Sequence, residues 1–71
     1  MTCNPDWNNS PSWAEWFGID EDGYSWWFET KPEAYLRHGY WLQGSEKSYD
    51  KLAGRCPEKA IDWKNSLRKR P

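Results

Sequence analysis

Two short aromatic segments separated by an acidic turn form the clearest pattern in the sequence. Residues 13–19 (WAEWFGI) and 24–30 (YSWWFET) are largely apolar, and residues 20–23 (DEDG) lie between them. Aspartate favours the start of a tight turn, and glycine supplies the positive φ that closes it. Two such runs around an Asp-Gly turn are typical of a β-hairpin. We therefore predict strands over 13–19 and 24–30.

The register of this hairpin has two alternatives. A four-residue loop would pair Phe17 with Trp26, whereas a three-residue loop with Gly23 at a bulge would pair Phe17 with Trp27. Side chains alternate across a strand, so Trp26 and Trp27 point to opposite faces in either register. Both faces of the hairpin therefore carry large aromatic side chains.

The C-terminal part of the chain carries a helical pattern. Pro57 suits the first turn of a helix, and Trp63 and Leu67 fall on one helical face. This pattern predicts a helix over 57–68 that packs on the sheet face holding Trp26.

The remaining segments complete the expected fold. We predict a third strand over 40–43, a helical turn over 32–37 and a short helix over 45–53. Residues 1–12 are polar and rich in turn-forming residues, which indicates an irregular N-terminal arm before a single small domain over 13–71. The expected fold class is α+β, a small antiparallel sheet of about three strands with a C-terminal helix packed on one face.

Tryptophan dominates the apolar composition. The chain has 71 residues with 7 Trp, 4 Tyr and 2 Phe, and it contains no Val. A chain this short buries only roughly 60% of the surface that its unfolded state exposes, and one buried aromatic side chain removes on the order of 200 Å² from water. We therefore expect the Trp residues mainly to build the core.

One short helix covers only one face of a small sheet, so the face of Trp27 needs another cover. In one alternative Trp27 stays exposed and binds a protein partner, with the acidic turn favouring a basic partner surface. This predicted site comprises Trp27, Phe17, Trp16, Asp20, Glu21 and Asp22. In the other alternative, the N-terminal arm folds over this face through Trp7 and closes the core.

Charge is divided unevenly along the chain. Residues 1–33 carry a net charge of −6 and residues 34–71 a net charge of +5. Such asymmetry indicates either two halves that pack together or a basic segment that binds a polyanion. Aromatic stacking on bases would suit single-stranded nucleic acid, but the acidic hairpin repels phosphates. The candidate nucleic-acid contacts are Lys64, Arg68, Lys69 and Arg70.

No motif for catalysis, cofactor binding or metal binding emerges from the sequence. The acidic turn lacks the ligand spacing of a calcium loop, and Cys3, His38 and Cys56 are too scattered for a zinc site. Phosphate-binding glycine motifs are absent. We expect a protein that is not an enzyme and holds no cofactor or metal.

The two cysteines bear on the cellular compartment. No apolar run fits a signal peptide or a membrane-spanning segment, so we expect a reducing cytosol with Cys3 and Cys56 as free thiols. A disulfide between them is the alternative.

Two stretches of the chain resemble small uncharacterised proteins of tailed bacteriophages and prophages. The first pattern is Trp13, then Asp20-Glu21-Asp22-Gly23, then Trp26-Trp27-Phe28-Glu29-x-Lys31-Pro32. The second is the ending Trp63-x-x-Ser66-Leu67-x-x-Arg70-Pro71. The resemblance implies a phage-encoded protein that works in the cytoplasm of an infected bacterium. Its implied partner is a host or host-defence protein, and a second copy of this chain is an alternative partner for the aromatic face.

Overall fold

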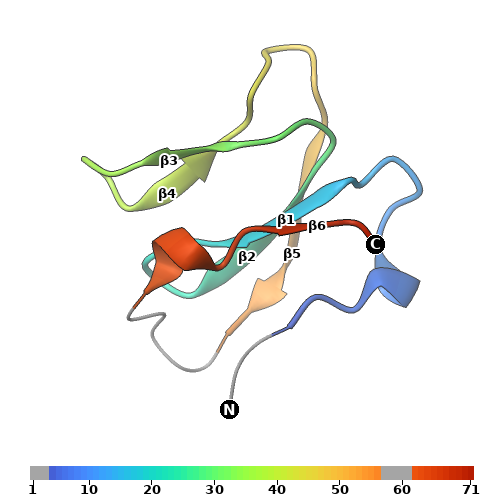
Figure 1. The fold of residues 1–71 in the computed structure, drawn as a ribbon, viewed down its shortest axis with the longest axis horizontal. Helices are drawn as coiled ribbons and strands as arrows, with labels where there is room; N and C mark the ends of the chain where they lie inside the picture. The colour runs from blue at the N-terminus through green and yellow to red at the C-terminus, as the bar shows by residue number, and fades with distance from the viewer. Residues whose placement is uncertain (1–3, 57–61) are drawn as a thin grey trace.

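The computed structural model describes residues 4–56 and 62–71. These residues form six β-strands and two short 3-10 turns, with no α-helix among them. The strands are β1 (Trp16–Ile19), β2 (Tyr24–Phe28), β3 (Glu33–Tyr35), β4 (Tyr40–Leu42), β5 (Asp50–Arg55) and β6 (Arg68–Lys69), and the 3-10 turns are η1 (Trp7–Asn9) and η2 (Trp63–Asn65) (Figure 1). The expected α+β class is therefore wrong, because the chain is mostly β-sheet.

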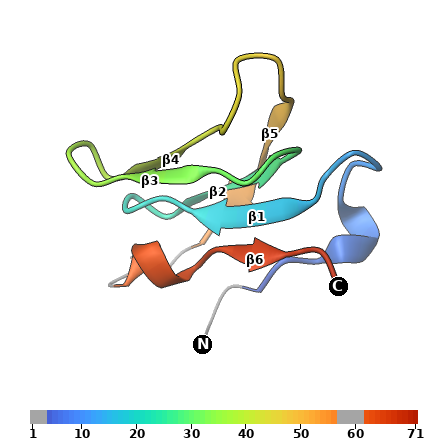
Figure 2. The same cartoon turned by 45° about the horizontal axis from the view of Figure 1, so that its top comes forward.

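The strands form two antiparallel sheets. One has four strands in the order β5-β2-β1-β6, and the other is the β3–β4 hairpin. Figure 2 shows this hairpin on one side of β1 and β2, with the N-terminal arm and η1 on the other side. The four-stranded sheet is therefore covered on both faces.

The β1–β2 hairpin adopts the register of the three-residue loop. Phe17 lies opposite Trp27, and Asp20 N–H donates to the Tyr24 carbonyl at 2.8 Å. Gly23 has a φ of 95°, a value that favours glycine, and its N–H donates to the Asp20 carbonyl at 2.9 Å. Both predicted strands exist, although each is shorter than expected. The third predicted strand, over 40–43, corresponds to β4.

The predicted C-terminal helix is wrong where the structure describes it, and the prediction for 57–61 lies outside the described residues. Residues 63–65 form the 3-10 turn η2, and residues 68–69 form β6, which pairs with Trp16 and Phe17 of β1. Pairing with the open edge of β1 satisfies backbone groups that a helix would have satisfied internally, so tertiary structure overrides local preference. Trp63 is nevertheless buried on the expected face.

The predictions of a helical turn over 32–37 and of a short helix over 45–53 are also wrong, because both segments contain strand residues. Residues 33–35 pair with 40–42 across a four-residue turn, and residues 50–55 pair with β2. The segment 45–53 offers too few apolar residues for a buried helical face, whereas a strand there pairs its backbone with β2 and requires little burial.

Each of the seven Trp residues belongs to one of two clusters, one on each face of the four-stranded sheet. The first contains buried Ala14, Phe17, Ile19, Trp27 and Cys56, with Trp7 and Trp13 packed against it. The second contains buried Phe28, Trp41 and Trp63, with Trp16, Trp26, Ala34 and Leu67 packed against it. This arrangement confirms that Trp builds the core. No helix among the described residues is long and apolar enough to cross a membrane.

A glycine allows the β3–β4 hairpin to approach the larger sheet. A Cβ placed on Gly18 would lie 2.9 Å from Cδ1 of Trp41, closer than side chains tolerate. The Trp41 indole N–H also donates to the Ile19 carbonyl at 3.0 Å. Gly18 and Trp41 therefore fix how the hairpin lies on β1.

Candidate functional site

The predicted exposed aromatic face is buried in the structure. The side chain of Trp27 is only 6% exposed, and that of Phe17 is also buried. The Trp27 ring lies 5.1 Å from the Trp7 ring and 5.2 Å from the Phe17 ring, centroid to centroid. The N-terminal arm thus covers this face through Trp7. The prediction that Trp27 is exposed is wrong. The structure has the alternative arrangement, in which the N-terminal arm folds over this face and closes the core.

Arg70 holds the arm in this position. Its guanidinium donates to the Ala14 carbonyl and to Ser10 Oγ, both at 2.6 Å, and to the Pro11 carbonyl at 3.1 Å. The same group lies over the Trp7 ring, 5.2 Å from its centroid. Arg70 was a candidate nucleic-acid contact, but its hydrogen-bonding groups are directed into the protein.

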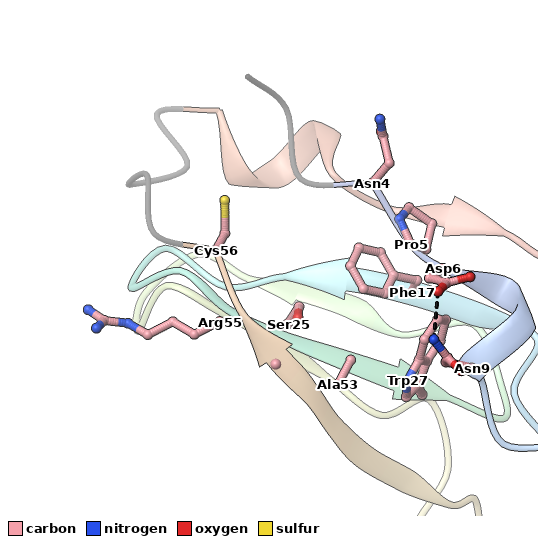
Figure 3. A pocket seen from close by; sticks show the side chains of 11 residues that line it. Asn4, Pro5, Asp6, Asn9, Phe17, Ser25, Trp27, Ala53, Arg55 and Cys56 are labelled. Carbon is pink, nitrogen blue, oxygen red and sulfur yellow. Dashed lines mark hydrogen bonds between the residues drawn. The ribbon is translucent and has the colours of Figure 1, made fainter.

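A pocket of about 300 Å³ lies between the arm and the C-terminal end of β5 (Figure 3). Its polar residues are largely committed to other contacts. The Asp6 carboxylate caps η1 by accepting from Asn8 N–H and the Asn9 amide, and the Arg55 guanidinium lies 5.4 Å from the Tyr24 ring centroid. Figure 3 shows the Arg55 side chain extending away from Trp27. The pocket therefore offers few polar groups for a ligand.

Neither the cysteines nor the histidine form a reactive site in the described part of the chain. Cys56 is buried and disulfide-bonded, so the expectation of a free thiol is wrong for this residue, while Cys3 lies outside the described residues. His38 is exposed in the β3–β4 turn. No group of three or more potential metal ligands occurs among residues 4–56 and 62–71.

Asp20, the first residue of the predicted acidic site, is buried. Its Oδ1 accepts the backbone N–H of Trp41 at 2.8 Å, so it connects the β1–β2 turn to β4. Burial raises the pKa of this carboxyl, and the nearby charge of Asp22 adds to the rise, while hydrogen bonds from Trp41 and Trp26 oppose it. Asp20 therefore has a structural role and is not available to a partner.

The other two acids of the turn are on the surface. Asp22 accepts the N–H of Tyr24 at 3.0 Å, a local turn contact. Glu21 N–H donates to the Gly39 carbonyl at 2.8 Å, and the Glu21 side chain lies directly beside Gly39. The acidic turn is therefore adjacent to the turn of the β3–β4 hairpin.

Trp16 and the basic C-terminal residues lie along the β1–β6 edge. Trp16 is half-buried, and its ring centroid lies 5.7 Å from Lys31 Nζ and 5.9 Å from Lys69 Nζ. Arg68 is exposed, and its Nη1 donates to the carbonyls of Asn65 and Leu67. Lys64 is exposed as well. The structure thus brings Trp16 and Lys69 together but separates them from Trp27.

Exposed aromatic and aliphatic side chains lie together on the outer face of the β3–β4 hairpin and in its turn. Ala34 and Trp41 pair with each other and pack toward the core. Side chains alternate along a strand, so the outer face carries Glu33, Tyr35, Tyr40 and Leu42. Tyr40 is 37% exposed and Leu42 is 39% exposed, and Leu36 in the adjoining turn is 66% exposed.

Three rings on this hairpin form an ordered group that we term the Tyr-His-Tyr stack: Tyr35, His38 and Tyr40. Their centroids are separated by 5.0 Å (Tyr35–His38), 5.3 Å (Tyr35–Tyr40) and 6.1 Å (His38–Tyr40). All three ring planes lie within 16° of parallel to one another. Rings that already support one another lose little conformational freedom when a partner binds, so the stack is a preorganised contact surface.

The sequence analysis missed this surface, because it treated residues 32–37 as helical. The available signal was two short runs, Glu33-Ala34-Tyr35 and Tyr40-Trp41-Leu42, that contain strand-favouring aromatic residues and flank a four-residue segment ending in glycine. No protein-family model, curated protein or solved structure matches this chain.

Proposed function

We propose that this chain is a non-catalytic, phage-encoded protein-binding module that acts on a host or host-defence protein. Its binding surface is the outer face of the β3–β4 hairpin. The observation that carries the proposal is the Tyr-His-Tyr stack, in which His38 and Tyr40 are exposed and Tyr35 is half-buried, together with exposed Leu36 and Leu42 on the same hairpin. Contiguous exposed apolar surface is costly to solubility and marks interaction sites, and tyrosine is among the residues that dominate interface energies.

The second group of exposed apolar side chains is a weaker candidate. Tyr24, Tyr49 and Leu52 lie on or next to the edge of the larger sheet at β5. Lys51 and Arg55 lie on this same edge strand. Charged side chains on an edge strand discourage pairing with another chain. These residues therefore serve better as a control surface than as the proposed site.

Single-stranded nucleic acid is the second candidate partner. The half-buried Trp16 ring lies near Lys31 and Lys69, with exposed Arg68 on the same strand as Lys69. An aromatic ring with nearby cations suits stacking on a base next to a phosphate. Such binding would weaken steeply between low and moderate salt, whereas binding of a protein through the aromatic hairpin surface would weaken only severalfold.

A capture experiment with matched variants tests the proposed protein-binding site. The double variant Tyr35→Ser/Tyr40→Ser removes the two tyrosine rings, and Tyr49→Ser removes a 62% exposed tyrosine outside the hairpin. Proteins captured from a bacterial host lysate by the parent are identified by mass spectrometry and purified for measurement of Kd. We expect the double variant to weaken Kd at least tenfold and Tyr49→Ser to leave it unchanged, with both variants folded by circular dichroism. Equal capture by the parent and the double variant would refute the site.

The proposed location is the cytoplasm of the infected bacterium, as the resemblance to phage proteins implies. Cell fractionation after expression in the host, with immunodetection of the protein, tests this location. Recovery from the periplasm, where a disulfide such as that at Cys56 persists, would contradict it.

A further inference from the structure

Two acidic residues, Glu33 and Glu21, lie on or against the hairpin that carries the Tyr-His-Tyr stack. Glu33 lies on the same outer face of the hairpin as Tyr35, directly across from Leu42. Glu21 lies beside Gly39, which separates His38 from Tyr40 in the sequence. Both carboxylates are on exposed residues. The hairpin thus combines nearly parallel aromatic rings with the negative charge of Glu33 on the same face and of Glu21 beside the turn.

We propose that the segment of the partner protein bound by this hairpin is basic and presents arginine. The guanidinium group lies flat against the Tyr-His-Tyr stack, and Glu21 and Glu33 neutralise its charge. This inference rests on the proposed function, because it specifies the partner chemistry of that same surface.

The geometry of the rings favours arginine over lysine. A guanidinium is planar and weakly hydrated, and it stacks on aromatic faces, whereas an ammonium is a compact and strongly hydrated charge. The stack offers rings that are nearly parallel to one another, within 16°. A planar cation can lie face to face against an outward-facing ring of the stack, and the quadrupole of that ring attracts it.

The charge of the surface favours a protein segment over nucleic acid. Arg37 is the one basic side chain between residues 32 and 42 besides the imidazole of His38, and it projects from the turn between Leu36 and His38. Two acids oppose this charge: Glu33 on the outer face of the hairpin and Glu21 beside Gly39. A base stacked on the rings would bring its phosphate toward these carboxylates, and the repulsion would oppose binding.

Peptide titration followed by NMR tests the inference directly. The probes are a short capped peptide of alternating glycine and arginine, the corresponding lysine peptide and the corresponding glutamate peptide. We expect the arginine peptide to shift the backbone amide signals of Glu21 and of residues 33–42 in a saturable manner. Its Kd should be about threefold to fivefold lower than that of the lysine peptide, which corresponds to an exposed cation–π contact. The glutamate peptide should cause no shifts.

Single variants separate the contribution of the tyrosine ring to peptide binding from that of the carboxylate. Tyr40→Ser should abolish the preference for arginine over lysine, and Glu21→Gln should weaken both basic peptides by about threefold, as expected for an exposed ion pair. Glu46→Gln, which neutralises an exposed acid outside the hairpin, is the matched control. It should change neither the Kd of the basic peptides nor the preference for arginine over lysine. Equal affinity for the arginine and lysine peptides, or shifts spread over β5 and the arm, would overturn the inference.

Failure of this inference is distinguishable from failure of the proposed function. The Tyr35→Ser/Tyr40→Ser variant could fail to bind the captured protein while the parent does not bind the arginine peptide. In that case the hairpin is the binding surface, and the inference that the partner segment presents arginine is wrong. If that variant retains the captured protein, the surface itself is wrong.

Discussion

The guanidinium of Arg70 lies over the indole of Trp7, and this contact joins the two ends of the described chain. Trp7 in turn packs on Trp27 at the centre of one core cluster. A cation far along the sequence therefore helps to hold the N-terminal arm over the sheet. The same contact explains why the aromatic face around Trp27 is unavailable to a partner.

Replacement of Arg70 tests this arrangement. Arg70→Lys keeps the positive charge but cannot reach Ser10, Pro11 and Ala14 together, so it should lower the free energy of unfolding by about 2 kcal/mol. Urea unfolding followed by tryptophan fluorescence measures the change. Arg68→Lys, at an exposed position, is the control and should shift stability by less than about 0.5 kcal/mol. Equal stability of the two variants would show that Arg70 does not hold the arm.

Truncation of Trp27 should damage the fold. Trp27→Ala removes a buried ring from contact with Trp7 and Phe17, and we expect a loss of about 3–5 kcal/mol. Such a loss would unfold much of a domain this small. Thermal unfolding by circular dichroism is the measurement. If the variant melts like the parent and yet fails to capture the partner, Trp27 is part of the binding surface and not of the core.

Gly18 should not tolerate a side chain. Gly18→Ala places a Cβ against the Trp41 ring, and we expect a loss of about 1–3 kcal/mol as the hairpin shifts outward. Gly54→Ala is the matched control, because its Cβ would meet Ser25 Oγ at an ordinary 3.9 Å. Chemical denaturation of both variants provides the comparison. A loss at Gly54 as large as that at Gly18 would contradict the role assigned to the Gly18–Trp41 contact.

The buried carboxyl of Asp20 should make stability depend on pH. Because burial raises its pKa in the folded state, the folded protein binds this proton more tightly than the unfolded chain does. The contribution of Asp20 to stability is therefore greatest below its ordinary pKa of 3.8 and falls as the pH rises through the folded-state pKa.

Asp20→Asn isolates this contribution from that of the other acids. The amide oxygen can still accept the Trp41 N–H without bearing a charge, so the variant should lack this decline and be at least as stable as the parent at neutral pH. The difference in urea midpoint between variant and parent, measured across the acidic range, gives the result. A difference that does not vary with pH would contradict a raised pKa.

The parts of the fold that follow from the sequence are those set by local chemistry. The Asp-Gly turn predicted the hairpin but left two registers open, and the structure has the one in which Phe17 faces Trp27. Alternation along β2 placed Trp26 and Trp27 on opposite faces in either register. Trp63 reached its expected face although its backbone is not an α-helix. Burial of a large aromatic side chain thus constrained the fold more strongly than helical spacing did.

The strands that the sequence analysis missed depend on distant partners. β5 has little apolar alternation of its own and exists as a strand because β2 offers an edge, and β6 exists because β1 offers the opposite edge. The candidate site likewise depends on the pairing of strands. The acidic turn was evident in the sequence, but the Tyr-His-Tyr stack forms only when Tyr35 pairs with Tyr40 across the turn.

The pairing of β6 with β1 also affects when the molecule can fold during synthesis. A ribosome releases Trp16 and Phe17 well before Arg68 and Lys69, so the edge of β1 stays open while the rest of the chain is made. Until Arg70 emerges, the arm packs on Trp27 through Trp7 without the hydrogen bonds that the Arg70 guanidinium donates to Ser10, Pro11 and Ala14. The nascent chain therefore presents an unpaired strand edge and a loosely covered aromatic surface, features that favour aggregation and chaperone binding. We expect the native packing of both ends to form only after translation has passed these last residues.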